Sequence, residues 1–314
     1  MQHQTKDLHP VVTRRTFLKA SAATLAGLGL TSIFCQHLPW GKPYSLVRFG
    51  MVTDIHYADT ETKDVRFYRD SLDKLAECVQ FMNEQKVDFL IELGDFKDQD
   101  TPPAEEKTLG YLRTVEKEFQ RFSGPTYHVL GNHDMDTISK TQFLANIINT
   151  NQDPYRTYYS FDQGGIHFVV LDANYLADGT DYNHGNFHWT DANVPPQELD
   201  WLEKDLSAAP LPTIVFIHQL LDGKGSVYVK NAYKVRQVLQ KSGQVLTVFQ
   251  GHHHAGSLQQ IENIHYYTLK ALVTGPPPDN NSYAIVEIKS NLDVVVTGYR
   301  NATSSQLPKA TSQT

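Results

Sequence analysis

The chain has 314 residues, of which 40% are hydrophobic, and is therefore long enough to bury a substantial core as one large globular domain. Its mean hydropathy of -0.41 excludes a protein with several membrane spans. The formal net charge of -7 at pH 7 disfavours non-specific binding to nucleic acid, which needs an excess of basic side chains.

The first 40 residues differ from the rest of the chain. Thr13-Arg14-Arg15-Thr16-Phe17-Leu18-Lys19 precedes the small and apolar run 20–34, a pattern that resembles a twin-arginine export signal. This resemblance implies a prokaryotic host, the export machinery as a partner, and a periplasmic or extracellular location. A chance arginine pair before a buried helix is the alternative. No Ala-x-Ala site follows, and Phe34 before Cys35 fits lipoprotein processing poorly, so an uncleaved membrane tether stays open.

The remainder is more acidic. Residues 1–40 hold four of the 28 Lys and Arg and one of the 35 Asp and Glu, which leaves 24 basic against 34 acidic side chains. We expect no stable nucleic-acid partner for so acidic a body. Cys78 is the one cysteine left, within a helical pattern, so we expect it to be buried filler rather than half of a disulfide.

Strands and helices alternate in the first half, which predicts parallel strands linked by crossover helices. The predicted elements are strands at 47–53, 87–93 and 127–130, helices at 64–86 and 104–122, and a helix-like stretch running to residue 149. Lys97-Asp98-Gln99-Asp100 reads as a solvated loop.

Carboxylates and a histidine follow the first two strands. Asp54 and His56 come after the first, and since alternate residues of an extended segment share a face, both could grip one cation. Asp95 comes after the second, behind Gly94, which permits a tight turn. A carboxylate with two oxygens suits two cations held about 3.5–4 Å apart.

Gly131-Asn132-His133-Asp134 follows the third strand. The amide of Asn132 offers an oxygen ligand, and the imidazole of His133 can move a proton at neutral pH. Asp134, next along the chain, could hold that ring in one tautomer. Taken alone, each of these motifs is more typical of a turn, a helix cap or an exposed histidine than of a metal site.

The second half begins with an antiparallel hairpin, predicted where Gln163-Gly164-Gly165 separates apolar runs at 158–162 and 166–171. Residues 172–196 form a long aromatic-rich segment without periodicity, which fits substrate recognition and a self-packed loop equally well. The other predicted elements are a helix from 196, a strand at 211–217, a helix at 230–240, a strand at 245–250, and short antiparallel strands at 264–269, 282–288 and 294–299. The predicted organisation is a signal segment at 1–40, one domain at 41–302 and a disordered tail at 303–314.

Histidines follow two of the later strands. His218 ends the strand at 211–217, and Gly251-His252-His253-His254 ends the strand at 245–250. Alternation favours His252 and His254 as ligands, with His253 turned away, although three adjacent histidines can also be incidental.

These five motifs, in this order and each at the end of a strand, resemble the calcineurin-like metallophosphoesterase superfamily from about Val47 to Arg300. Four further segments resemble the manganese-dependent ADP-ribose/CDP-alcohol diphosphatases within it: Asp64–Leu72, Phe168–Ala173, Leu199–Leu202, and His265–Leu269 before Pro276-Pro277-Pro278-Asp279.

The resemblance implies an α/β fold, an α+β sandwich in which two packed mixed β-sheets are flanked by helices in four layers. It implies two divalent metal ions, the first held by Asp54, His56, Asp95 and His254, and the second by Asp95, Asn132, His218 and His252. Ligands without thiolate suit Mn, Fe or Zn. The animal diphosphatases have glutamine where this chain has His56, so manganese dependence does not transfer directly.

The resemblance also implies roles beyond the metal ligands. His133, oriented by Asp134, would protonate the leaving oxygen. Arg66 and Arg69, near a predicted helix start, could contact a distal phosphate or an aromatic base; solvent-facing helix arginines are the alternative.

The sequence therefore predicts an exported phosphohydrolase with two metals that cleaves phosphodiester or pyrophosphate bonds of small nucleotide-type substrates. A phosphomonoesterase or a nuclease of the same superfamily is the alternative among enzymes. A non-catalytic metal-binding scaffold is a weaker one, because both Asp95 and His133 are present.

Overall fold

The computed structural model describes residues 42–310. The predicted export signal at 1–40 lies outside the described residues. The chain divides into Met1–Lys42 and a compact unit, Pro43–Thr314, which carries every described strand and helix. None of the helices between residues 42 and 310 combines the length and the apolar character that crossing a bilayer requires.

Six strands form the first sheet, in the order β12-β11-β10-β1-β2-β3. They are β1 (Ser45–Val52), β2 (Phe89–Glu92), β3 (Thr126–His128), β10 (Ser282–Lys289), β11 (Val294–Arg300) and β12 (Ser305–Leu307). β1, β2 and β3 run parallel, so their carboxyl ends lie at one edge. The later strands join β1 antiparallel through β10.

The second sheet also has six strands, in the order β4-β5-β6-β7-β9-β8. They are β4 (Tyr159–Gln163), β5 (Ile166–Val170), β6 (Thr213–Ile217), β7 (Val245–Gln250), β8 (Ser257–Ile261) and β9 (Ile264–Thr268). β5, β6, β7 and β9 run parallel, with β4 and β8 antiparallel at the two edges.

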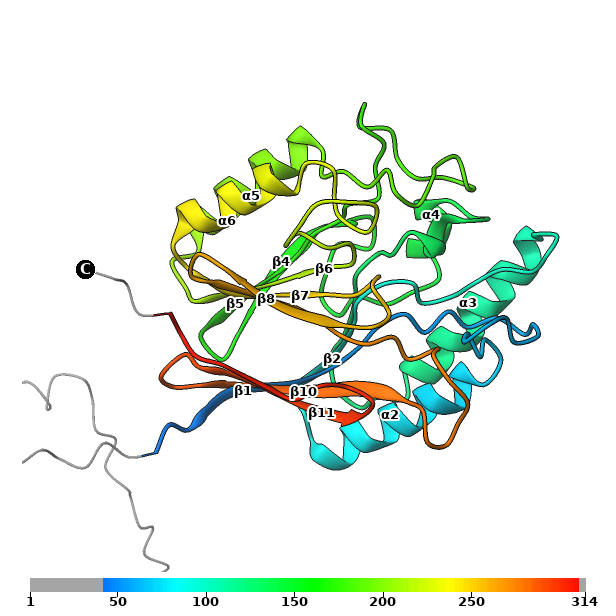
Figure 1. Ribbon diagram of the computed structural model, residues 1–314, viewed down its shortest axis with the longest axis horizontal. Coiled ribbons are helices and arrows are strands. Elements are labelled where there is room, and N and C mark those ends of the chain that lie inside the picture. The colour runs from blue at the N-terminus through cyan, green and yellow to red at the C-terminus, as the bar shows by residue number, and fades with distance from the viewer. Residues whose placement is uncertain (1–41, 311–314) are drawn as a thin grey trace, which may run out of the picture. The chain divides into compact units, whose positions relative to one another are not determined.

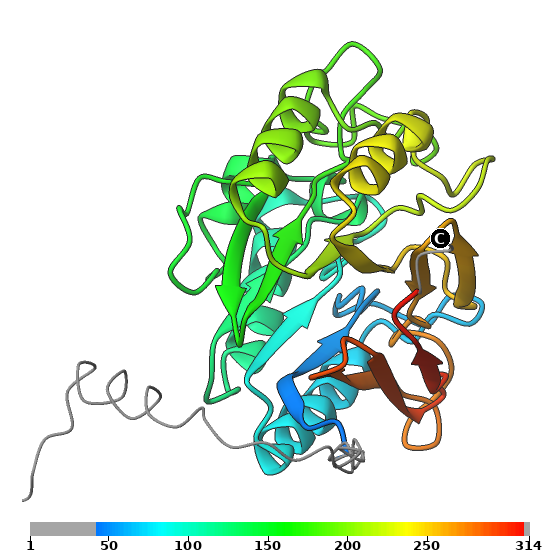
Figure 2. The ribbon, with the colours of Figure 1, turned by 90° about the vertical axis from the view of Figure 1, so that its left-hand side faces the viewer.

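Helices cover the outer face of each sheet, which gives four layers (Figure 1). α2 (Ser71–Gln85) and α3 (Glu105–Phe119) pack on the first sheet, and α5 (Pro196–Ala208) and α6 (Ala232–Ser242) on the second. Figure 2 shows the two helical layers on opposite sides of the sheets. The predicted four-layer sandwich of two mixed sheets is confirmed.

Aromatic side chains fill the space between the sheets. Phe49 of β1 stacks on Phe89 of β2 at 4.8 Å and meets Phe168 and Phe216 of the second sheet edge to face, at 5.7 and 5.6 Å. Edge-to-face pairs add to the free energy gained by burying the rings. This core fixes the strand ends of one sheet relative to those of the other.

Five local predictions need correction. α2 begins at Ser71 rather than residue 64, because the backbone of the preceding segment forms hydrogen bonds with a distant loop instead of helical ones. Phe67 N–H donates to the carbonyl of Val273 at 3.0 Å. β8 was not predicted, and β9 pairs with β7 in parallel. The predicted disordered tail is wrong over Ser305–Leu307, since Leu307 is buried in the core between the sheets.

The fourth correction concerns the supposed solvated loop after β2. Lys97 is 0% exposed and Asp98 is 7% exposed. Both lie among the polar groups at the strand ends, where the Lys97 ammonium donates to the carbonyl of His133.

The fifth correction concerns the long helix-like stretch expected before residue 149. A short helical turn, η1 (His133–Met135), and α4 (Lys140–Leu144) replace it.

Candidate metal centre

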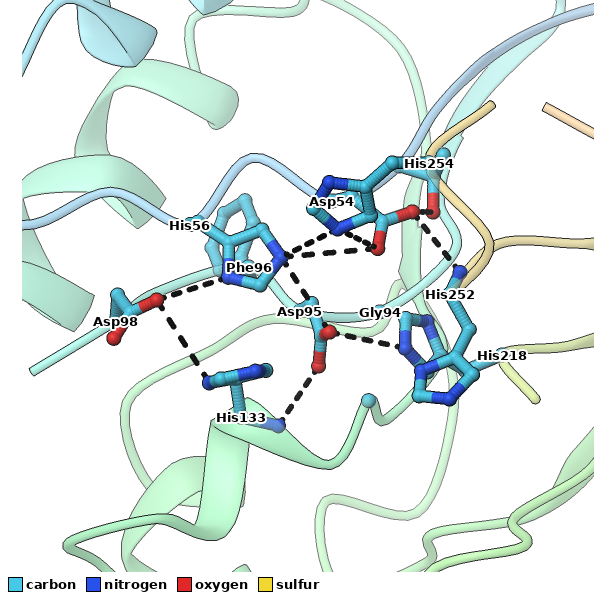
Figure 3. Close-up of polar contacts among 12 residues, drawn as sticks. Asp54, His56, Gly94, Asp95, Phe96, Asp98, His133, His218, His252 and His254 are labelled. Carbon is cyan, nitrogen blue, oxygen red and sulfur yellow. Dashed lines mark hydrogen bonds and ion pairs between the residues drawn. The ribbon is translucent and has the colours of Figure 1, made fainter. Parts of the chain in front are cut away.

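The sequence motifs meet at one edge of the sandwich, where the carboxyl ends of β1, β2, β3, β6 and β7 converge. Figure 3 shows the imidazoles and carboxylates pointing toward one another. The residues brought together are Asp54, His56, Asp95, His218, His252 and His254, with His133 beside them. Asn132 lines the same pocket as Asp95 and His252. All seven predicted metal ligands are therefore close neighbours.

Left-handed backbone conformations aim these side chains. Asp54, His56, Asp95 and His252 have φ of 52°, 47°, 57° and 64°. Such residues cost about 1–2 kcal/mol each unless the surroundings hold them. Here His56 N–H donates to the carbonyl of Asp95 at 2.8 Å. The side chains of Asp54 and His56 do converge, as expected. The expected reason is wrong, because the two residues do not lie on one face of an extended segment.

Gly131 is required by the close approach of two loops. A Cβ atom there would collide with the backbone nitrogen and the carboxylate of Asp95. Only a residue without a side chain lets the loop after β3 lie against the loop after β2. That contact brings Asn132 within reach of Asp95.

The first group of donors surrounds Asp54. Its Oδ1 lies 3.3 Å from His254 Nε2 and 3.7 Å from His56 Nε2, and the two imidazole nitrogens are 3.3 Å apart. Ligand atoms that bind one cation tetrahedrally at about 2.1 Å lie roughly 3.4 Å from one another. The spacing of these donors therefore fits a transition-metal ion.

The second group surrounds Asp95. Its Oδ2 lies 3.1 Å from His218 Nε2 and also 3.5 Å from His56 Nε2 of the first group. His218 Nδ1 donates to the carbonyl of Leu93 at 2.7 Å, which leaves Nε2 as the nitrogen that faces Asp95 and would bind a metal ion. Asp95 therefore lies between the two groups, at the position that a shared ligand would need.

Unpaired buried atoms mark positions where cations would bind. Within residues 42–310, four buried side-chain atoms of this centre that could bind a metal ion have no hydrogen-bond partner: Asp54 Oδ1, Asn132 Oδ1, His218 Nε2 and His252 Nε2. Buried polar atoms without partners are costly and rare. Two cations would satisfy all four, so the residues present fit a centre for two divalent metal ions.

The charge state of His252 suits metal binding. Burial and the neighbouring His218 lower the pKa of His252 to about 3, so its imidazole is neutral at physiological pH. The neutral ring is the form that binds a metal. Burial opposes ionisation of Asp95, but the facing histidines, His218 first, hold its pKa well below the usual value.

The residue that orients His133 differs from the prediction. Its ring Nδ1 lies 2.6 Å from Oδ2 of Asp136, and Asp98 is 3.7 Å away. Asp134 does not contact the ring: its carboxylate accepts from the backbone N–H groups of Gly131 and Phe96 at 2.8 and 2.9 Å. The η1 turn places a residue three positions on, rather than the next one, beside the ring.

Asp98 is a second residue that the sequence did not identify. Its Oδ2 lies 3.0 Å from Nδ1 of His56, which directs His56 Nε2 toward the metal centre. A carboxylate behind a metal-binding histidine fixes the ring and raises its basicity. The run Asp95-Phe96-Lys97-Asp98 contains this partner, but only the fold shows that it faces His56.

A pocket of about 360 Å³ opens over the centre. Arg66, Trp189 and Val227 line it together with His133 and several of the predicted metal ligands. Arg69, predicted as a second substrate contact, does not line it: its guanidinium is exposed and pairs with Asp59 and Glu61. His253 is exposed beside the two ligand histidines, as expected.

Comparisons with known proteins agree with this geometry. The family model described as Calcineurin-like phosphoesterase matches residues 47–256. A manganese-dependent ADP-ribose/CDP-alcohol diphosphatase of Oryza sativa subsp. japonica is 27% identical over 276 residues, covering 74% of this chain and 85% of the relative. A 3',5'-cyclic-nucleotide phosphodiesterase of Nostoc is 25% identical over 227 residues, covering 70% and 76%. A dimetal phosphatase structure from Danio rerio superposes with a TM-score of 0.74 at 20% identity, covering 85% of this chain and 100% of that one.

Fold and centre together define a metal-dependent hydrolase of phosphoric esters that uses two divalent cations. Since the family model spans more than half of the residues, the chain belongs to the calcineurin-like phosphoesterase family. The resemblance to the manganese-dependent diphosphatases that the sequence predicted is confirmed.

Proposed function

We propose that this enzyme hydrolyses phosphodiester or pyrophosphate bonds of small nucleotide-type substrates, and that it does so after export. The proposal is carried by the four unpaired buried atoms around Asp95, two of which belong to Asn132 and His252 in the lining of a pocket that His133 and Arg66 also line. The names of the rice and Nostoc relatives support the substrate class.

The predicted metal ligands form two groups, one for each cation. When bound, two divalent cations polarise the phosphoryl oxygens and bring the pKa of an attacking water into the neutral range. Asp54, His56 and His254 form one side of the cradle, and Asn132, His218 and His252 form the other. Asp95 joins the two sides and keeps them at a fixed separation. Imidazole and carboxylate donors favour Mn, Fe or Zn over Ca or Mg.

His133 is the proton donor in this proposal. Its side chain is 26% exposed, on the wall of the pocket, and the Asp136 carboxylate holds Nδ1. This leaves Nε2 to give a proton to the leaving oxygen. The backbone N–H of His133 also donates to Oδ1 of Asp95 at 2.8 Å, which ties the proton donor to the residue shared by both metal groups.

Arg66 supports a substrate with a second anionic group. Within residues 42–310 its guanidinium forms no ion pair, although Arg66 lines the pocket. The pKa of His254 is lowered mainly by burial, and the positive charges of His56 and Arg66 lower it further, so Arg66 lies close to the metal centre. An arginine with no carboxylate partner beside a phosphate site is suited to bind a further phosphate. A diphosphate presents that group and a simple monoester does not.

A substrate panel tests the proposal. We would measure kcat/KM for ADP-ribose, CDP-choline, a cyclic nucleotide and a simple monoester, with metal content determined on the same sample. The proposal expects a diphosphate or a diester to be the best substrate. A preference for the monoester would favour the phosphomonoesterase alternative, and an absence of hydrolysis by metal-loaded protein would favour a scaffold.

Export rests on the arginine pair in the first 40 residues. Twin-arginine transport carries folded proteins, which suits an enzyme whose metals are loaded in the cytoplasm. The double variant Arg14→Lys, Arg15→Lys should leave the protein in the cytoplasmic fraction, whereas the natural sequence should appear outside it. Equal distribution of the two would contradict export, and N-terminal sequencing of the exported form would show whether the segment is removed or kept as a tether.

A further inference from the structure

Trp189 is a partly exposed aromatic residue beside the metal centre. It lies in the aromatic-rich segment between β5 and α5, is 41% exposed, and lines the pocket over the metal centre. Its ring centroid is 5.8 Å from that of His252, one of the predicted metal ligands. The indole is therefore adjacent to the place where a phosphate would bind.

The segment that carries Trp189 is held in place by contacts at several points. Tyr182 is fully buried and stacks on Phe187 with ring centroids 3.8 Å apart and planes 2° from parallel. Gly185 N–H donates to the carbonyl of Met135 at 2.9 Å, in the turn that also carries His133. The N–H of Asp191 donates to the carbonyl of His188 at 2.9 Å, which closes a turn around Trp189 itself. The indole is thus preorganised relative to the centre.

The surroundings select the kind of group that Trp189 would bind. A cation could also pack on an indole face, but positive charge nearby would oppose it. Among the described residues that line the pocket, Asp95 contributes a carboxylate, but this group is already placed in the metal centre: Oδ1 accepts from the His133 N–H at 2.8 Å, and Oδ2 lies 3.1 Å from His218 Nε2, where a metal ion would bind. Arg66 adds positive charge to the same pocket. A neutral planar ring fits this wall better than an ammonium group does.

We infer that Trp189 is a stacking platform for a nucleobase, and that it determines specificity for substrates whose base lies within one sugar of the reacting phosphate. This inference rests on the proposed function and adds the residue that reads the base. Stacking on an aromatic side chain accepts any base, because every base has a π face. The pocket would therefore distinguish nucleotides from alkyl phosphodiesters rather than one base from another.

The test compares Trp189→Leu and Trp189→Phe with Trp201→Phe, a matched control on α5 that packs against Tyr158 at 4.9 Å. For each protein we would measure the ratio of kcat/KM for ADP-ribose to that for a glycerol phosphodiester. Loss of one base–aromatic stack predicts a fall in this ratio of about 5- to 150-fold in Trp189→Leu. Trp189→Phe should retain most of the selectivity, and Trp201→Phe all of it.

A binding measurement separates this inference from the proposed function. AMP and ribose 5-phosphate differ only by the base, and calorimetry on the full chain gives their affinities without turnover. Trp189→Leu should lose the preference for AMP over ribose 5-phosphate. If it binds both ligands as the natural protein does, or weakens both equally, the inference is overturned. If no phosphodiester or pyrophosphate is hydrolysed but the AMP preference depends on Trp189, the proposed function fails, and with it the role of Trp189 in substrate specificity, while the contact between Trp189 and the base is retained.

Discussion

The ring Nδ1 of His133 lies 2.6 Å from Oδ2 of Asp136, three residues further along the chain. Burial alone would lower the pKa of this imidazole, but the carboxylates of Asp136, Asp95 and Asp98 raise it to about 10. The ring is therefore held in one orientation and carries a proton at neutral pH. Both properties suit a group that protonates a leaving oxygen.

Replacing His133 or its partner Asp136 should slow the reaction without loss of metal ions from the centre. We expect His133→Ala to reduce kcat by ~10²–10⁴-fold and Asp136→Asn by a smaller factor, ~10–100-fold, because the ring stays present but loses its orientation. Metal content should stay at the natural level in both variants. Unchanged turnover of a substrate with a poor leaving group would remove this role from His133.

Asp134 should behave as a structural residue instead. Its carboxylate ties the loop after β2 to the loop after β3 through the N–H groups of Gly131 and Phe96. Asp134→Ala leaves these buried donors unpaired, so the free energy of unfolding should fall by about 2–4 kcal/mol. Thermal melting beside Asp136→Asn checks this; a natural melting temperature with slow turnover would instead assign Asp134 to the chemistry.

Residues that directly follow strands could be located from the sequence. Asp54, His218 and His252 each stand within two positions of a strand end, and parallel strands bring their carboxyl ends to one edge, so the ligand set followed from strand order. Asp98 and Asp136 could not be found in this way. Their roles depend on a left-handed residue at Asp95 and on the η1 turn, which leave no periodic pattern.

Contacts over long sequence separations account for most of the other differences. The start of α2 depends on a hydrogen bond between Phe67 and Val273, about 200 positions apart, which no local propensity encodes. The short strand β12 forms because Leu307 fills a space in the central core. Trp189 lies in a segment without periodicity. The sequence could not show whether this segment lines a pocket or only packs on itself, and only the fold distinguishes the two.

Lys74 should stabilise the loop beside the first metal motif. Its ammonium is buried on α2 and donates to the carbonyls of Leu272 at 3.0 Å and Gly275 at 2.5 Å. The same loop meets the metal motif, since Val273 N–H donates to the carbonyl of Asp54 at 3.1 Å. Lys74→Met leaves buried carbonyls unpaired, so we expect a loss of about 2–4 kcal/mol in unfolding free energy and weaker metal binding.

Denaturant unfolding and metal titration measure the two effects of Lys74→Met. Lys234→Met, an exposed lysine on α6, is the matched control and should change neither. If Lys74→Met melts like this control, the ammonium does not hold the loop.

His167 should make stability depend on pH far from the metal centre. Its Nδ1 lies 2.6 Å from Asp162 on β4, and its Nε2 lies 2.9 Å from Asp205 on α5. Burial opposes the charge, but hydrogen bonds to Asp205 and Asp162 raise the pKa of His167 overall. A histidine with a raised pKa in the folded state stabilises the fold fully below its unfolded pKa, about 6.5, and loses this effect as pH rises through the folded value.

Melting temperatures across pH test the His167 bridge. The natural protein should exceed His167→Gln by about 2–4 °C near pH 5.5, and the difference should shrink near pH 9. Asp205→Asn should remove most of the same pH dependence. A difference that stays constant over this range would mean that packing, rather than charge, holds His167.

The central claim is that two cations are held around the shared carboxylate of Asp95, which lies 3.1 Å from His218 and 3.5 Å from His56. Elemental analysis of the metal-loaded protein beside Asp95→Ala measures this most directly. We predict two divalent ions per chain in the natural protein, and loss of both metal and activity together in Asp95→Ala. Two ions retained by Asp95→Ala, or fewer than two in the fully active natural protein, would contradict the account.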